Sequence, residues 1–513
     1  MTRFVTQDDS AATRRKGKTK EREPKQEPNL LFFSDYESGN LHKVKPLNDG
    51  IEYEISLRPD TLADQYRNWF YFSCFGCRPN QRVVFSVVNF SKQRSLYRDR
   101  MTPLVRSRSR PHLGWARLPP RNCFYYKSSR HGGQYLLSFV FTFDGDENEV
   151  YDFAYSFPYP YTKLQKYLDT LERTCCCSGG GNLDYRLERS LLCRTNQMRR
   201  VDMIEISGKE GLTPTSFLQN GKQRGGRRGS SGKENGNGAA YLHAHSPVRP
   251  VIAITGRVHP GETPASFVIQ GFLDFVTSQQ EEACYLRKAA DIVVVPMLNP
   301  DGVFLGNYRT DATGVDLNRR WDAPSKEIEP SLYWTKELLK SINKEKGRKL
   351  DMFIDVHAHS TSKRSFMFCN PPKSMEISSM GSEEDLKEKE RDWATMNRLR
   401  KVLIFLEFLD MYMLEFSMAT CRWDIDSHKV GSARRALEKI LPETLCYTFE
   451  ASFFHDIGGF SHSESAFGQK QHKVSQEHAQ SQAGKVNTEK GYIGMGEQLG
   501  RALSHYYKSL ERF

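Results

Sequence analysis

The sequence lacks any uninterrupted apolar run of about 20 residues, the length that an α-helix needs to cross a lipid bilayer. Its N-terminal stretch, MTRFVTQDDSAATRRKGKTK, also lacks the apolar core of a secretory signal. We therefore expect a soluble protein that has no membrane span and is made and retained in the cytosol.

A framework of paired cysteines is lacking as well. The 11 cysteines are scattered and odd in number, and those at 175–177 are adjacent, which is unlike a small secreted domain held by disulfides. Cys74 and Cys77 form one CxxC motif, but no second pair follows at zinc-finger spacing. Free thiols are expected at these two positions in preference to a structural zinc site or a redox pair.

Acidic residues are too few to balance the basic ones. The chain has 74 Lys and Arg against 62 Asp and Glu, which gives a formal net charge of +12. Such a balance favours an acidic partner, and nucleic acid, an anionic membrane surface and an acidic protein all fit. Composition leaves the choice among them open.

At 513 residues the chain is long enough for two or three domains. Residues 1–28 are charged and poor in aliphatic side chains, which predicts a disordered basic tail. Short aromatic and β-branched segments separated by turn residues fill 30–158 and predict a small antiparallel β-sandwich domain. That domain shows no obvious catalytic cluster, so packing or substrate presentation is its expected role. A catalytic domain is expected at 159–513, with flexible insertions near 174–182, 219–247, 375–400 and 461–489.

The second domain alternates between strand and helix patterns. This alternation predicts an α/β fold with a mixed, mainly parallel sheet covered by helices on both faces. Residues 375–400 are strongly charged and predict an exposed helix or loop. The expected strands are 250–256, 291–298, 350–356 and 445–454, and the expected helices start at Pro264 or cover 331–345 and 493–510.

A polar loop, His259-Pro260-Gly261-Glu262, joins the strand at 250–256 to the next helix. Thr263 and Pro264 predict the start of that helix, as N-cap and first-turn residue. Ligands of open α/β sheets bind at this edge, where strands end and helices begin. His357 follows another strand, so it is expected to join His259 and Glu262 around one metal ion. Two imidazoles and one carboxylate favour catalytic Zn²⁺ with an open position, and His359 is expected to lie near these ligands without binding the metal itself.

Several stretches resemble the zinc carboxypeptidase family, and most of all its cytosolic branch. In chain order they are GRVHPGETPASF, MLNPDGVFLGNYR, DLNRRW, FIDVHAHS, VGSARR and CYTFEASFF. The N-terminal module shares the likeness through ESGNL, RPDT, VNFSKQRSLYRD and FAYSFPYPYT. The resemblance therefore covers roughly residues 31–170 and 245–510.

The resemblance implies a catalytic zinc centre. It makes His259, Glu262 and His357 the ligands of one Zn²⁺ per chain. It makes Glu450 the catalytic glutamate, in agreement with what a carboxylate beside a zinc-bound water can do as a proton acceptor. An ion pair with an arginine is the structural alternative for this glutamate. Arg309 matches the arginine that polarises the scissile carbonyl and stabilises the oxyanion.

The resemblance also implies how the substrate is held. Asn318 and Arg319 match the pair that binds the terminal carboxylate, for which a planar guanidinium is well shaped. Arg434 stands where the family's specificity arginine is found, and a cation there selects an acidic side chain. Arg435 and Lys429 are alternatives for that role.

The implied activity is removal of glutamates from the carboxyl ends or polyglutamate side chains of proteins, with tubulin and microtubules as the leading partners. Nucleic acid is not expected as a partner, and the expected location is the cytosol, with association with microtubules, centrioles or cilia. Two other functions are considered: a non-catalytic protein that binds an acidic surface, and a zinc amidohydrolase of N-acyl amino acids. Three features depart from the family: Arg320 in place of Asn or His, no counterpart of the mobile tyrosine, and an unlike stretch at 400–430.

Overall fold

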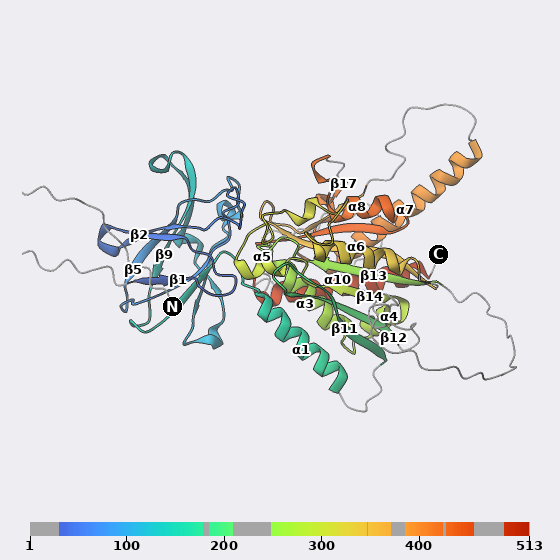
Figure 1. Cartoon of the computed structure of the whole chain (residues 1–513), viewed down its shortest axis with the longest axis horizontal. Coiled ribbons are helices and arrows are strands. Elements are labelled where there is room, and N and C mark those ends of the chain that lie inside the picture. The colour runs from blue at the N-terminus through green and yellow to red at the C-terminus, as the bar shows by residue number, and fades with distance from the viewer. Residues whose placement is uncertain are drawn as a thin grey trace, which may run out of the picture.

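The computed structural model describes residues 30–177, 184–208, 248–345, 347–370, 385–423, 427–455 and 487–511. Its N-terminal part is a β domain, and the rest is an α/β domain that lies beside it (Figure 1). In the described ranges, no helix is both long and apolar enough to cross a membrane.

The β domain consists of two five-stranded sheets. One sheet has the order β1 (Leu31–Phe33), β4 (Tyr71–Phe75), β10 (Tyr151–Ala154), β6 (Leu104–Ser107) and β7 (Ala116–Arg117). The other has the order β2 (Lys43–Leu47), β3 (Glu52–Ser56), β5 (Arg82–Val87), β9 (Gln134–Thr142) and β8 (Cys123–Ser128). The strands pair antiparallel as predicted, except that β3 and β5 are parallel.

Aromatic side chains join the two sheets of the β domain. Phe72 and Phe153 stack within the first sheet, with ring centroids 5.6 Å apart. Phe85 of the second sheet lies 5.2 Å from Phe153 and 5.3 Å from Phe139. All four rings are buried, so the alternating apolar positions of these strands form the core of a sandwich. Cys74 and Cys77 are buried and form no disulfide with each other.

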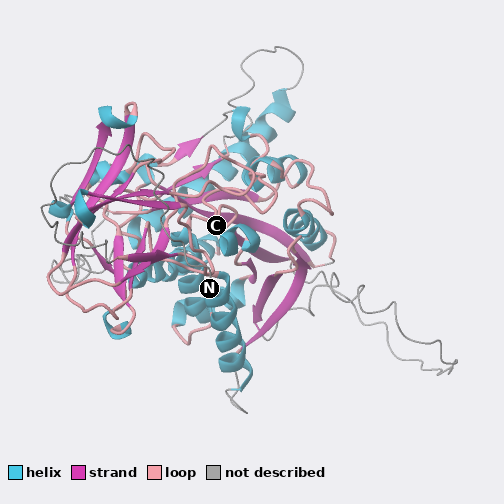
Figure 2. Cartoon of the chain, turned by 60° about the vertical axis from the view of Figure 1, so that its left-hand side comes forward, coloured by secondary structure: helices cyan, strands magenta, loops and turns pink. Residues whose placement is uncertain are grey.

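The α/β domain is built on a mixed eight-stranded sheet, which confirms the predicted fold class (Figure 2). Its central strands β14, β13, β15 and β18 are parallel, and β16 pairs antiparallel with β18 and parallel with β17. Four strands were not predicted. Two are β16 and β17, and the others are β11 and β12, which add an antiparallel edge next to β14. In spatial order the strands are β11 (Tyr185–Arg194), β12 (Arg200–Gly208), β14 (Asp291–Val295), β13 (Arg249–Gly256), β15 (Arg348–His359), β18 (Leu445–Ser452), β16 (Phe366–Cys369) and β17 (Arg422–Trp423).

Helices cover both faces of this sheet. Along β13, Ile252 and Ile254 pack into one apolar cluster with α3 and α10, whereas Val251 and Ala253 pack into another with α6 and α8. A strand buried on both sides must be apolar at successive positions, which explains its sequence VIAIT. The helices are α1 (Tyr161–Cys177), α3 (Thr263–Val276), α4 (Glu281–Ala289), α5 (Pro300–Leu305), α6 (Pro330–Ile342), α7 (Asp385–Tyr412), α8 (Ala433–Ile440) and α10 (Glu489–Leu510).

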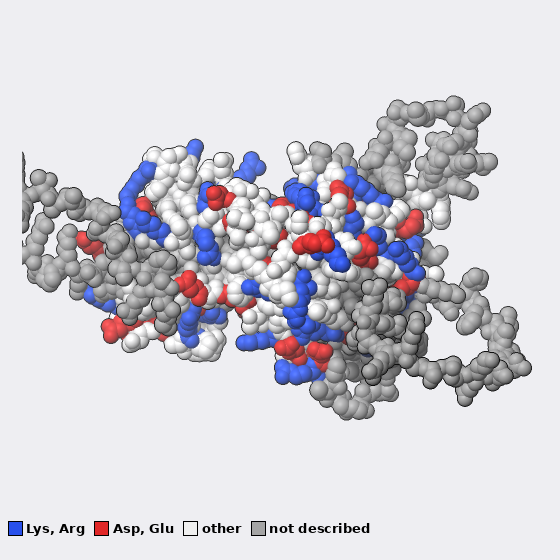
Figure 3. Space-filling view, viewed as in Figure 1, with Lys and Arg blue, Asp and Glu red and all other residues white. Residues whose placement is uncertain are grey.

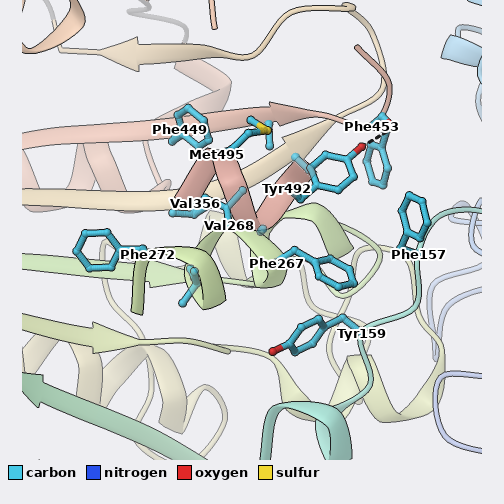
Figure 4. Packing of buried hydrophobic residues seen from close by; sticks show 14 of the residues in the cluster. Phe157, Tyr159, Phe267, Val268, Phe272, Val356, Phe449, Phe453, Tyr492 and Met495 are labelled. Carbon is cyan, nitrogen blue, oxygen red and sulfur yellow. Dashed lines mark hydrogen bonds between the residues drawn. The ribbon is translucent and has the colours of Figure 1, made fainter. Parts of the chain in front are cut away.

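The packing of α10 against α3 fixes the helix that follows the metal-binding loop. A Cβ atom at Gly496 of α10 would lie 2.0 Å from the carbonyl oxygen of Val268, so only glycine allows this approach. Near the β domain, the Tyr492 hydroxyl donates a 2.7 Å hydrogen bond to the carbonyl of Phe453 (Figure 4). The last helix of the chain therefore holds both α3 and the end of β18.

Several predicted segments lie partly or wholly outside the described residues. The basic tail at 1–28 and the insertions at 219–247 and 461–489 are among them. Cys175, Cys176 and Cys177 belong to the end of α1, and the stretch at 375–400 overlaps the first half of α7.

Candidate zinc site

The loop that carries His259 and Glu262 connects β13 to α3. Glu262 occupies the cap position of α3, and Thr263 is the first helical residue, so the predicted N-cap is wrong by one position. The Glu262 side chain makes no capping hydrogen bond because its carboxylate faces the two histidines instead. The Thr263 hydroxyl is buried and has no hydrogen-bond partner among the described residues.

Arg257 holds this loop in shape. Its φ is +56°, an uncommon conformation for a residue other than glycine, and its side chain is fully buried. The guanidinium donates to the carbonyl oxygens of Pro260 and Tyr159 and to the Ser266 hydroxyl, at 2.8, 3.1 and 2.8 Å. Burial lowers the pKa of Arg257 to about 9. Sequence reasoning missed this residue, although it stands only two positions before His259.

His259, Glu262 and His357 converge, each buried, and one donor atom of each lies within 4.8 Å of the others. Glu262 Oε1 is 2.9 Å from His259 Nδ1, and Glu262 Oε2 is 3.0 Å from His357 Nδ1. The Ala358 N–H also donates to Glu262 Oε2, at 3.0 Å. The structure therefore brings together the three residues predicted as metal ligands.

Two aspartates orient the histidines from behind. His259 Nε2 lies 3.1 Å from Asp316 Oδ1, and His357 Nε2 lies 2.7 Å from Asp355 Oδ2. A carboxylate only accepts, so an N–H at each Nε2 would donate to its aspartate, and Nδ1 is then the ring nitrogen of each histidine that could bind a metal beside Glu262. Sequence reasoning missed Asp316 and Asp355, although both stand within quoted motifs, two residues before Asn318 and His357.

This donor set fits a divalent cation. Two imidazole lone pairs and a carboxylate facing one another repel unless a positive charge lies among them. Without a metal, a proton on His357 supplies this positive charge. The carboxylates of Asp355 and Glu262 raise the pKa of His357 well above its usual value despite burial. The Nε2–H groups bonded to carboxylates match the outer hydrogen bonds of zinc-bound histidines. The residues present therefore fit zinc.

Glu450 lies next to the triplet on β18. The parallel register of β15 and β18 sets Glu450 opposite His357, so both side chains project from the same face of the sheet. Burial raises the pKa of Glu450 to about 7, against the opposing effect of His357. In the described part of the chain, no Lys or Arg forms an ion pair with it, so the structural alternative of an arginine-paired glutamate lacks its partner.

Arg309 is held between the two domains. Its Nε donates to Asp316 Oδ2 at 2.8 Å, which links the guanidinium through Asp316 to His259. From the β domain, Asp60 accepts hydrogen bonds from the backbone N–H groups of Tyr308, Arg309 and Thr310 at 2.6, 2.7 and 2.9 Å. The β domain thus sets the conformation of the arginine loop, a contribution more specific than the packing role expected from its sequence.

Gly261 allows the loop that carries Tyr308 and Arg309 to approach the metal-binding motif closely. Its N–H donates to the carbonyl of Tyr308 at 2.8 Å. A Cβ atom at this position would lie 2.5 Å from Tyr308 Cδ2, which no side chain tolerates. The glycine therefore permits direct contact between the metal-binding motif and the arginine loop.

Replacing Asp60 by Asn is expected to lower kcat/KM by about 10- to 100-fold. The backbone at Arg309 would be held less firmly, and a guanidinium displaced by a small distance stabilises the reacting carbonyl less well. Zinc content should remain unchanged, because Asp60 contacts none of the three candidate ligands. Steady-state kinetics and metal analysis check this, with exposed Asp64→Asn from the same segment as control. Equal kinetics for both variants would remove Asp60 from the positioning of Arg309.

The predicted carboxylate grip lies on the 3₁₀ turn Leu317–Arg319. Asn318 Nδ2 is 3.4 Å from His357 Nε2, and Asn318 Oδ1 accepts from the Ala433 N–H at 3.1 Å. Arg319 is exposed, and one N–H of its guanidinium donates to the carbonyl of Asn318 at 2.9 Å. Asn318 therefore borders the histidine cluster, and Arg319 presents a guanidinium at its rim.

Arg434 is the second residue of α8 and directly follows Ala433. Its side chain is buried and donates to the carbonyl of Cys369 at 2.9 Å and to the amide oxygen of Asn370. Because Ala433 bonds Asn318, the structure brings Arg434 next to the predicted grip. Of the two alternatives, Arg435 is partly exposed, and Lys429 lies over the Phe368 ring at 4.3 Å.

Two other predicted features lie apart from the cluster. His359 ends β15, and its Nε2 donates to the carbonyl of Arg364 at 3.0 Å. Its described side-chain contacts go to the following loop and to the Phe366 ring of β16, and to none of the three candidate ligands. Arg320, which departs from the family pattern, forms a 2.9 Å ion pair with Glu329.

Family models match the chain in two places. Residues 32–155 match the cytosolic carboxypeptidase N-terminal domain, and residues 186–368 match the zinc carboxypeptidase model. Cytosolic carboxypeptidase 6 of Homo sapiens is 36% identical over 93% of this chain and 79% of its own length. Its namesake from Caenorhabditis elegans is 35% identical over 94% and 88%.

Solved structures share the fold at lower identity. A metallo-carboxypeptidase from Burkholderia cenocepacia has a TM-score of 0.64 at 17% identity, covering 94% of this chain and all of its own. One from Pseudomonas aeruginosa has a TM-score of 0.60 at 20% identity, with coverage of 94% and 100%. The family matches, the identity to the curated relatives and the buried His-Glu-His cluster together show that this chain belongs to the zinc carboxypeptidase family, in its cytosolic carboxypeptidase branch.

Proposed function

We propose that this carboxypeptidase removes glutamate from the carboxyl ends or polyglutamate side chains of proteins. Tubulin is the leading substrate, with action in the cytosol on microtubules, centrioles or cilia. The observation that carries the proposal is Arg434, a buried arginine that directly follows Ala433, whose N–H bonds Asn318. A buried cation favours a carboxylate in the substrate side chain and disfavours a lysine there.

Net charge alone supports the proposal less than this buried cation does. On the face seen in Figure 3, Lys and Arg are interspersed with Asp and Glu over both domains. Selectivity for an acidic chain end is therefore expected to come from the charged residues of the site and not from the overall surface charge.

The roles of the chain's own residues follow from their positions. Glu450, with a pKa raised to about 7, can accept the proton of an attacking water near neutral pH and pass it to the leaving amine. Arg309 can stabilise negative charge on the scissile carbonyl oxygen, because Asp316 holds it beside His259. Asn318 and Arg319 can hold the terminal carboxylate, which restricts cleavage to the chain end.

Zinc would be held by His259 Nδ1, His357 Nδ1 and the Glu262 carboxylate, with one ion per chain. When bound, it supplies Lewis-acid polarisation of the carbonyl and lowers the pKa of a water molecule.

Peptides that differ only in a C-terminal Glu, Gln or Lys test the specificity. Wild-type protein is expected to release Glu most efficiently. Arg434→Gln should lower kcat/KM for the Glu peptide by about 10- to 100-fold, because one charge-assisted hydrogen bond is lost. The same substitution should change kcat/KM for the Gln peptide little. Release of lysine but not glutamate by the wild type would overturn the proposed function.

Matched variants separate Arg434 from its two alternatives. Arg435→Gln and Lys429→Gln remove the same charge from the same segment, and both are expected to retain the preference for Glu. Loss of the preference in either of these variants, with Arg434→Gln unaffected, would transfer the role to that residue.

A further inference from the structure

Lys92 belongs to the β domain, yet its ammonium group lies in the catalytic domain's site. Its Nζ donates to the hydroxyl of Tyr308 and, at 3.2 Å, to the hydroxyl of Ser360. Tyr308 directly precedes Arg309, and Ser360 stands three residues after His357. The motif that contains Lys92, VNFSKQRSLYRD, was singled out in the sequence and has no part in the roles assigned so far.

The backbone at Lys92 is fixed, although it lies in a loop. The Ser91 N–H donates to the carbonyl of Arg67 at 3.0 Å, and the Ser91 hydroxyl accepts from the Arg67 N–H at 3.0 Å. The Tyr125 hydroxyl donates to the Lys92 carbonyl at 2.7 Å, and the Tyr125 ring stacks on Tyr135. The ammonium is therefore delivered from a rigid part of the β domain.

The charge of Lys92 is not neutralised by a nearby carboxylate. Among the described residues no Asp or Glu forms an ion pair with it, and both of its hydrogen-bond acceptors are neutral hydroxyls. An ammonium has three N–H donors, so one remains available. Burial lowers the pKa of Lys92, while Tyr155, Glu262 and Glu450 act in the opposite direction. An additional anion at this place would stabilise the ammonium.

Lys92 and Arg434 lie on opposite sides of Glu450 along the sheet. Arg434 bonds the carbonyl of Cys369, which pairs with Tyr447, three residues before Glu450 on β18. Ser360 follows His359, whose partner Ser452 lies two residues after Glu450. If the residue to be released binds on the Arg434 side, the residue before it lies on the Lys92 side.

We propose that Lys92 binds the acidic side chain of the penultimate residue of the substrate, so that a chain end with two successive glutamates is preferred. The inference rests on the proposed function for the direction of binding, with the released residue at Arg434. The penultimate position is chosen over earlier ones because Tyr308, which contacts the ammonium, adjoins the arginine predicted at the scissile carbonyl. Lys92 makes the β domain a part of substrate recognition.

The test compares peptides that end in Glu-Glu and Gln-Glu, which differ by one charge at nearly constant shape. Wild-type protein is expected to prefer Glu-Glu by about tenfold in kcat/KM, the effect of one partly exposed charge pair. Lys92→Met should reduce this ratio to about one, mainly through a higher KM for Glu-Glu. Lys92→Arg should keep part of the preference.

Lys127→Met is the matched control, because Lys127 is an exposed lysine of the same domain, and it should keep the wild-type ratio. Thermal melting and zinc content verify that each variant is folded, and Lys92→Gln, which can still bond Tyr308 and Ser360, replaces Lys92→Met if the latter unfolds. A purely structural role would lower both activities equally and leave the ratio unchanged, which would overturn the inference.

The ratio is measured on the terminal residue that the wild type releases best. Failure of the proposed function, seen as preferential release of another residue, is therefore distinguishable from failure of the inference. An equal rate for Glu and Gln at the penultimate position of the wild type would also overturn the inference.

Discussion

Replacing Glu450 by Gln is expected to lower kcat by about 10²- to 10⁴-fold, the contribution of a positioned general base and acid. Glutamine has nearly the same shape but can neither accept the proton of an attacking water nor return it to the leaving amine. KM should change little, because Glu450 is assigned no contact with the terminal carboxylate or the acidic side chain. Steady-state kinetics on a Glu-terminated peptide checks both parameters.

The variant should remain folded and should keep its zinc. Burial raises the pKa of Glu450 to about 7, so folding favours the neutral form of this carboxyl in the metal-free protein. A neutral amide is therefore expected not to lower the free energy of unfolding, and Tm should be equal to or above that of the wild type. Glu443→Gln, at an exposed position just before β18, is the matched control for both kinetics and melting.

Two results would contradict this role. Full activity in Glu450→Gln would mean that another group moves the proton, and the proposed mechanism would be wrong. Loss of zinc together with activity would mean that Glu450 supports the metal site instead, as a structural neighbour of His357.

The metal cluster could be predicted from the sequence because each member follows a recognisable strand. His259 and Glu262 come after one predicted strand, and His357 comes directly after another, 350–356, so parallel pairing brings them to one edge. In the structure β15 extends to His359, beyond the predicted end, so that His357 itself belongs to the strand and pairs with Glu450 of β18. The prediction depended on the strand ends, which the hydrophobic pattern indicates, and on the resemblance of the surrounding motifs to zinc carboxypeptidases.

The supporting residues could not be predicted in the same way. Asp60 and Lys92 are 199 and 167 residues before His259 in the chain, and no periodicity relates a turn of the β domain to a loop after α5. Asp316 and Asp355 stood in quoted motifs, but a carboxylate near a histidine is common, and only the observed distances reveal the hydrogen bonds.

The antiparallel pair β11 and β12, with β11 at the edge of the sheet, was missed for a different reason. Arg186, Glu188 and Arg189 of β11 interrupt the apolar alternation that marks a strand, because β11 lies at the edge of the sheet. Charged residues are usual on such strands, where they discourage pairing with other chains. Without these two antiparallel strands, the predicted sheet was more parallel than the sheet in the structure.

Replacing His357 by Ala is expected to abolish activity, with kcat/KM lowered at least as strongly as in Glu450→Gln. The variant retains Glu262 and His259 but loses one of three donors, so zinc content should fall well below one ion per chain. In the wild type, saturating zinc should raise the free energy of unfolding by about 4 kcal/mol at 1,000 times its Kd. In His357→Ala that stabilisation, measured as a zinc-dependent rise in Tm, should nearly disappear.

Chelation tests the same centre without mutation. Removal of the metal from the wild type should abolish glutamate release and lower Tm, and added zinc should restore both, whereas His357→Ala should not recover. His42→Ala, which removes an exposed imidazole of the β domain, controls for adventitious binding by surface histidines. Zinc retained at one ion per chain in His357→Ala would place the metal elsewhere. Activity that survives complete removal of zinc would contradict the proposed zinc site. His259, Glu262 and His357, among which Glu262 lies within 3.0 Å of both imidazoles, would then hold no metal that the reaction needs.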